Sequence, residues 1–131
     1  MKFGKSILTP SYFRKPDFDS VGMVENSFKF ICVNCQKKVE IEFESIIGKE
    51  WSWHDKFDEK TNTEIKQFYD MNAVNKAPDG GWTAIDKCHC KNCQTQYLIY
   101  AGVDEYRNSC YAITMQGITE ILEDESATNR I

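Results

Sequence analysis

Strict alternation of apolar and polar side chains marks two neighbouring segments in the first third of the chain. Phe28 and Phe30 alternate with polar neighbours, and a second alternating run follows at 39–43. Period-two alternation is typical of a strand with one buried face. Residues 27–44 are therefore predicted to form a β-hairpin, whose turn contains the phrase CVNCQ at residues 32–36.

A similar arrangement recurs in the second half of the chain. The segment WTAIDK (82–87) predicts a short strand, CKNCQ (90–94) the turn, and TQYLIYA (95–101) the returning strand. A further alternating run at 110–116 predicts another strand, which Gly117 is expected to end.

Between the two hairpins lies an insertion of residues 45–81 with a different pattern. The phrase TNTE matches a capping box, with Thr61 as the N-cap and Glu64 reaching back to it. Apolar residues then follow at helical spacing, which predicts a helix over roughly 62–74 that ends before Pro78.

The remaining segments complete a single domain of residues 1–131. Residues 1–26 carry prolines, glycines and aromatics without a clear period, and they predict an irregular arm packed on the core. Residues 123–131 predict a frayed tail. The expected fold class is α+β, an antiparallel sheet with a helix-containing insertion.

The two cysteine phrases predict a metal site. A C-x2-C turn lets two thiolates converge on one ion, and two such turns supply the four sulfurs of a structural zinc site. We therefore expect one structural Zn²⁺ held by Cys32, Cys35, Cys90 and Cys93.

In these two phrases the chain resembles a zinc ribbon, in which two hairpin knuckles hold one Zn²⁺. Asn34 and Asn92 occupy equivalent turn positions, where we expect a left-handed backbone because Asn tolerates it. Two features differ from the usual ribbon. Gln36 and Gln94 stand where ribbons often carry Gly, and the insertion places the knuckles unusually far apart in sequence.

Other roles for the cysteines remain as alternatives. The four thiols could be redox pairs, disulfides or unligated core residues. Cys88 or His89, next to the second phrase, could replace a predicted ligand, although each is more simply a strand or turn residue. Cys110 is expected to be a core residue. The early sequence has no signal-peptide pattern, so we expect a cytoplasmic protein.

Charge narrows the class of partner. The formal net charge is -4, and a four-thiolate zinc site would add about -2 more. An acidic chain disfavours nucleic acid and mildly favours a basic protein partner. No apolar run is long enough for a membrane helix, so no membrane partner is expected.

Sequence motifs do not predict an enzyme. Four sulfurs would close the coordination sphere, whereas a catalytic zinc keeps one position for water. His54 is followed by Asp55 and Lys56, so the H-x-E pattern of zinc deaminases is absent. An unrecognised metalloenzyme remains a minor alternative.

The predicted function is therefore binding, with a protein as the expected partner. Within WSWHDKF, the aromatic residues Trp51, Trp53 and Phe57 are candidates for the contact surface, because Trp is a favoured interface anchor. The alternative is that these rings belong to the core. The acidic, apparently non-catalytic character resembles that of immunity proteins, which neutralise a cognate toxin.

A nucleic-acid adaptor is the second functional hypothesis, because zinc ribbons often contact nucleic acid. It rests on five lysines around the cysteine phrases. These residues are Lys29, Lys37, Lys38, Lys87 and Lys91. The simpler interpretation is that they offset the negative charge of the thiolates.

Overall fold

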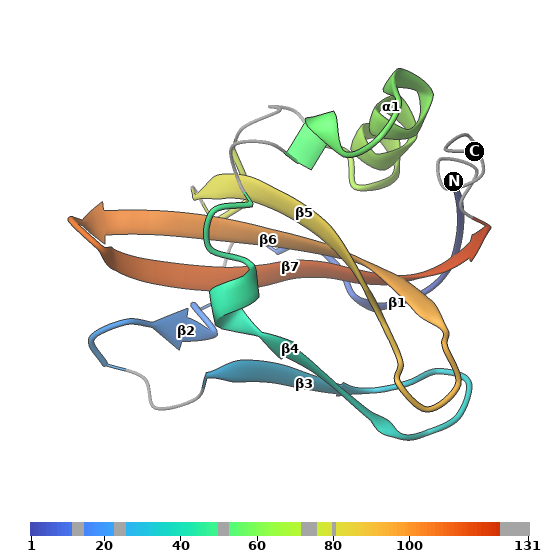
Figure 1. Ribbon diagram of the computed structural model, residues 1–131. Helices are drawn as coiled ribbons and strands as arrows, with labels where there is room; N and C mark the ends of the chain where they lie inside the picture. The colour runs from blue at the N-terminus through green and yellow to red at the C-terminus, as the bar shows by residue number, and fades with distance from the viewer. Residues whose placement is uncertain (12–14, 23–25, 50–52, 72–75, 80, 124–131) are drawn as a thin grey trace.

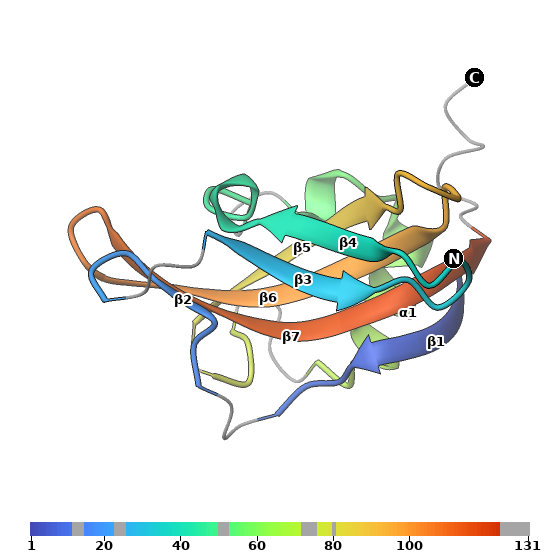
Figure 2. The same ribbon diagram turned by 90° about the horizontal axis from the view of Figure 1, so that it is seen from below.

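An antiparallel sheet of five strands carries a helix on one face and a separate β-hairpin on the other (Figure 1, Figure 2). The computed structural model describes residues 1–11, 15–22, 26–49, 53–71, 76–79 and 81–123. Its strands are β1 Lys2–Leu8, β2 Phe18–Asp19, β3 Ser27–Ile31, β4 Lys38–Glu42, β5 Trp82–His89, β6 Gln96–Arg107 and β7 Cys110–Glu123. Its helical elements are η1 Phe43–Ser45, η2 Trp53–Asp55 and α1 Glu59–Phe68.

Strand β7 is the centre of the large sheet. The order is β1-β7-β6-β5, and β2 pairs with another part of β7. Among the described strands, β3 and β4 pair only with each other, in register from Ser27 opposite Glu42 to Ile31 opposite Lys38. The hairpin predicted over 27–44 is confirmed, as is the pairing of the strands on either side of the second cysteine phrase.

Two apolar cores cover the two faces of the large sheet. The first lies under the β3–β4 hairpin and includes Phe30 and Ile41 from that hairpin. The second lies under α1 and η2, and includes Trp53 and Ile65. The sheet is therefore the middle layer of three, which is why the central strands bury side chains on both faces.

The helix begins and ends earlier than the sequence pattern suggests. Its N-cap is Asp58, whose carboxylate accepts a hydrogen bond from the Thr61 amide at 2.7 Å. Thr61 is buried within the first turn rather than acting as the cap, so the predicted capping box is wrong. The predicted helix is present, but it spans Glu59–Phe68, and residues 72–74 of the expected range lie outside the described residues. An Asp cap fulfils the same physical need, because it satisfies an unpaired amide at the helix start.

Strand β7 also runs further than predicted. Gly117 does not end it: Tyr100 pairs with Gly117 and Ala101 with Met115, so the strand passes through a β-bulge at Gln116 and continues to Glu123. A bulge lets a strand accommodate one extra residue while pairing resumes on either side.

The N-terminal segment is less irregular than expected. Strand β1 pairs with the last part of β7, so residues 2–8 extend the sheet. Glu123 belongs to β7, and the rest of the predicted frayed tail lies outside the described residues. No helix in the described ranges is long and apolar enough to cross a membrane.

Candidate metal centre

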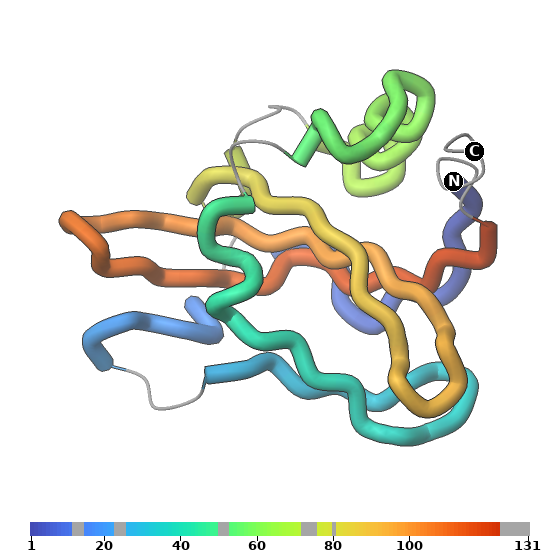
Figure 3. Tube along the Cα trace, in the orientation of Figure 1, coloured from blue at the N-terminus to red at the C-terminus, as the bar shows by residue number. Residues whose placement is uncertain are grey.

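The β3–β4 and β5–β6 turns lie side by side at one end of the molecule (Figure 3). Four cysteine sulfurs converge there. Cys32 and Cys35 come from the β3–β4 turn, and Cys90 and Cys93 from the β5–β6 turn. All four sulfurs lie within 4.8 Å of one another. The sequence reasoning therefore identified four residues that the fold brings together from positions nearly sixty residues apart.

The shortest sulfur–sulfur distances join one hairpin to the other. Cys32 Sγ lies 3.6 Å from Cys93 Sγ, and Cys35 Sγ lies 3.5 Å from Cys90 Sγ. Four sulfurs about 2.3 Å from a tetrahedral zinc ion are about 3.8 Å apart. The spacing of the cluster thus fits one ion of that size at its centre.

The two cysteine turns have the same backbone structure. In the first, the Cys32 amide donates to Lys37 O at 2.9 Å; in the second, the Cys90 amide donates to Thr95 O at 2.8 Å. The left-handed residues are Gln36, with φ of 66°, and Gln94, with φ of 65°. The expectation that the asparagines take this conformation is wrong, and the finding explains why zinc ribbons favour Gly at the glutamine position.

Hydrogen bonds favour a thiolate at the first cysteine. Burial by itself would raise the pKa of Cys32, but hydrogen bonds from the Tyr97 hydroxyl and the Cys35 and Asn34 amides lower that pKa to about 6. The Tyr97 hydroxyl donates to Cys32 Sγ at 3.2 Å. At Cys35, a hydrogen bond from the Lys37 amide is the largest cause of a lowered pKa.

The asparagine in each turn interacts with the opposite turn. Asn34 Nδ2 donates to Thr95 Oγ1 at 2.9 Å and to the Glu120 carboxylate at 2.8 Å. Thr95 Oγ1 in turn lies 3.0 Å from Cys93 Sγ. From the other side, the Asn92 side chain hydrogen-bonds the Cys35 sulfur and helps lower its pKa. These bonds fix the two turns relative to each other.

Sequence reasoning missed the groups that support the cysteines from outside the two phrases. Tyr97 is fully buried beside Cys32, and Glu120 is 8% exposed although it lies near an acidic stretch expected to fray. The sequence placed Tyr97 in the predicted strand 95–101 but gave it no role at the cysteines. No local signal marks Glu120, because its role depends on pairing between β7 and distant segments.

The neighbouring cysteines and histidine do not join the cluster. The group of four sulfurs found among the described residues contains neither Cys88 nor His89. Burial raises the pKa of the Cys88 thiol to about 12. His89 is exposed, and Cys110 is half-buried rather than fully in the core.

Two of the three aromatic residues expected at the contact surface are buried. Trp53 is fully buried and Phe57 is 8% exposed, and both belong to the core under α1. The assignment of these two rings to a partner surface is therefore corrected, because a side chain inside the core cannot anchor another protein without unfolding. Trp51 lies outside the described residues.

Lysines surround the cysteine turns. Lys37, Lys38 and Lys91 are exposed there. Glu40 and Glu42, also exposed, share strand β4 with Lys38 and interrupt the positive charge. The local charge is thus mixed.

No protein-family model, no curated protein and no solved structure matches this chain.

Proposed function

We propose that the chain is a zinc-stabilised, non-catalytic binding protein of the zinc-ribbon type that acts on a protein partner. One observation carries the proposal: two pairs of sulfurs, supplied by hairpins of two different sheets, approach to within 4.8 Å. A single ion there would join the two sheets at the end where their turns meet.

Zinc is the ion that the donor set favours. Soft thiolate ligands in a tetrahedral arrangement suit Zn²⁺, and backbone amides directed at Cys32 and Cys35 stabilise the charged sulfurs. The residues that would hold it are Cys32, Cys35, Cys90 and Cys93. Four sulfurs leave the ion no position for water or substrate, so its role would be structural.

The charge of the chain and the closed metal site support a protein as the partner. The chain carries a formal charge of -4, and a four-thiolate zinc centre would make it more acidic. This negative charge favours binding to a basic protein in the cytoplasm. A cationic toxin bound by an immunity-type inhibitor would be such a partner.

The second functional hypothesis is a nucleic-acid adaptor. It is favoured by the exposed Lys37, Lys38 and Lys91 around the cysteine turns. The glutamates on β4 and the acidic chain weaken it. Phosphate contacts make binding fall steeply with salt, so a salt series with DNA and RNA separates this hypothesis from protein binding.

The metal part is tested on purified protein with two matched cysteine variants. We expect wild type and Cys110→Ser to retain one zinc per chain by mass spectrometry of the intact protein, and Cys93→Ser to lose it at limiting zinc. Chelation should lower the midpoint of thermal unfolding of wild type and of Cys110→Ser. Full stability of metal-free wild type would contradict a structural zinc.

The binding part is tested with the partner itself. Proteins co-purified from the native source are identified, and each candidate is then purified and titrated against the chain. A single saturable partner with a basic surface supports the proposal. Binding only to nucleic acid, lost at high salt and on charge reversal of Lys37 and Lys91, would replace it by the adaptor.

A further inference from the structure

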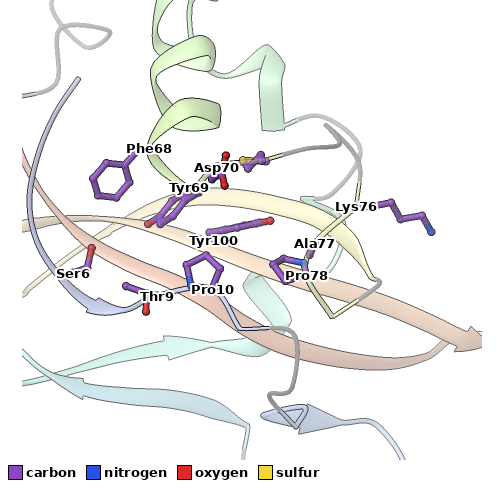
Figure 4. A pocket seen from close by; sticks show the side chains of 11 residues that line it. Ser6, Thr9, Pro10, Phe68, Tyr69, Asp70, Lys76, Ala77, Pro78 and Tyr100 are labelled. Carbon is purple, nitrogen blue, oxygen red and sulfur yellow. The ribbon is translucent and has the colours of Figure 1, made fainter.

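A cleft of about 540 Å³ opens on the helical face of the large sheet (Figure 4). The end of α1 forms one side, and Pro10 and Pro78 line the other. Tyr69 and Tyr100 lie between these walls (Figure 4). We call it the tyrosine cleft. Concave sites with an apolar lining and a few polar groups are the usual form of a binding site.

The floor of the tyrosine cleft is rigid. The rings of Tyr69 and Tyr100 have centroids 5.0 Å apart, and the Tyr69 hydroxyl lies 2.7 Å from Thr119 Oγ1 of β7 in a buried contact. At the rim, the Phe68 ring stacks on Phe3 at 4.1 Å and is still 40% exposed. Tyr69 is 7% exposed and Tyr100 is 2% exposed, so these rings form a packed floor, and the aromatic surface open to a ligand is mainly that of Phe68. Because the floor is already packed, little ordering would be needed on binding.

Two charged side chains, Asp70 and Lys76, line the cleft. Asp70 follows the C-terminal end of α1, where the carbonyl end of a helix already disfavours a carboxylate. Within the described part of the chain, no hydrogen bond or ion pair engages that carboxylate. A cation bound beside Asp70 would interact favourably with the carboxylate, the helix end and the aromatic faces together.

Lys76 also lines the cleft, but its ammonium group is directed away from Asp70 (Figure 4). The ammonium group of Lys76 lies over the Trp82 ring, 4.4 Å from its centroid. Figure 4 shows its side chain extending away from Tyr69, Tyr100 and Asp70. The cleft is thus apolar and aromatic inside, with an unpaired negative group at its edge.

We infer that the tyrosine cleft receives an arginine or lysine side chain from an extended segment of the protein partner. The inference rests on the proposed binding function and gives the basic partner a defined docking site. The aliphatic stem of such a side chain would lie along Pro10 and Pro78, and its charged end would pair with Asp70.

The probes are three N-acetylated, C-amidated tripeptides, Gly-Arg-Gly, Gly-Glu-Gly and Gly-norleucine-Gly. Each is titrated into ¹⁵N-labelled full chain while amide shifts are followed by NMR. We expect saturable shifts at Ser6, Asp70 and Ala77 with the arginine peptide, and weaker or no binding with the other two. Equal binding of all three peptides, or no saturable shift at these amides, would overturn the inference.

Asp70→Asn is the decisive variant, because Asn tolerates the left-handed conformation that Asp70 adopts, with φ of 52°. Loss of an exposed charge pair worth about 1 kcal/mol weakens binding about fivefold. The matched control is Asp55→Asn, an exposed acid with 75% side-chain exposure on η2. The control should leave the affinity unchanged.

Further outcomes separate this inference from the proposed function. If tetramethylammonium binds as tightly as the arginine peptide, the cleft is a site for small cations, and the peptide assignment is overturned. A purified partner that binds wild type and Asp70→Asn equally would leave the binding function standing but place its docking site elsewhere.

Discussion

At the scale of single residues, Tyr97 links the cysteine cluster to the core. Its ring packs edge-on against Phe30 with centroids 5.0 Å apart, and its hydroxyl donates to Cys32 Sγ and accepts from the Val33 amide at 3.0 Å. A hydrogen bond to a metal-binding thiolate orients the ligand and stabilises its charge. The hydroxyl therefore contacts the cysteine cluster while the ring packs in the core.

Replacing Tyr97 by Phe should separate these two contributions. The ring contacts remain, but the Cys32 sulfur loses a donor and its pKa should rise toward the ordinary value. We expect zinc affinity to fall about tenfold, the lower end for loss of an outer-shell partner. Unfolding free energy should fall by about 1–2 kcal/mol, because the Val33 amide also loses its acceptor. Competition with a chromophoric chelator measures the first quantity.

Tyr106→Phe is the matched control for this substitution. It removes the same hydroxyl, which here donates to Asp19 at 2.6 Å near the β6–β7 turn, at the opposite end of the sheet from the cysteines (Figure 1). Zinc affinity should be unchanged in this variant. If both variants bind zinc equally, Tyr97 does not tune the site.

The sequence predicted which four cysteines lie together, but it did not predict which residues surround them. The C-x2-C spacing is a local property, so the sequence contains it in full. Burial depends on what the rest of the chain places nearby. For this reason Trp53 and Phe57 looked like exposed anchors but lie in a core, and the left-handed turn residues are Gln36 and Gln94.

At the scale of elements, Gly117 of β7 allows the end of the helix to approach the sheet. Gly117 lies where a Cβ atom would come within 2.6 Å of the Tyr69 ring. The Tyr69 side chain reaches from the end of α1 to the sheet, where its hydroxyl hydrogen-bonds with the Thr119 hydroxyl. The glycine is therefore needed for close approach between α1 and β7 rather than for a chain break.

Gly117→Ala should push α1 away from the sheet. Overpacking of this kind costs about 1–3 kcal/mol of unfolding free energy. Gly22→Ala is the control, because nothing lies within 4 Å of its added Cβ, and its effect should stay within about 0.5 kcal/mol. Urea unfolding of both variants measures the difference. An equally small change in each would mean that Tyr69 moves aside freely.

Element prediction succeeded where one face of a strand is exposed. Strands β3 and β4 show alternation because they form an outer layer, and the pattern located them closely. Strand β6 is buried continuously from Tyr97 to Val103, so its pattern carries no period, and its length was underestimated. The start of α1 was misplaced because both Asp58 and Thr61 are good cap residues, and only packing decides between them.

At the scale of the whole molecule, the β3–β4 hairpin is joined to the rest by its side chains. In the described chain it pairs with no strand of the large sheet, and it is held by the core beneath it and by hydrogen bonds of its turn, such as that from Asn34 to Glu120. Sequence could not predict this division into two sheets, because the pairing of β1 with β7 joins segments more than one hundred residues apart. A lone two-stranded hairpin is marginally stable in water.

Removal of the metal should therefore destabilise the β3–β4 hairpin before the large sheet. In metal-free protein the β3–β4 amides should exchange about a hundredfold faster, corresponding to about 3 kcal/mol of lost protection. The β6–β7 pairing runs with two register shifts from Gln96 opposite Ile121 to Arg107 opposite Cys110, and its central amides should keep most of their protection. Hydrogen exchange with and without a chelator tests this directly. Uniform loss of protection in both sheets would show that zinc stabilises one cooperative unit, whereas no change in β3–β4 would show that the apolar core alone holds the hairpin.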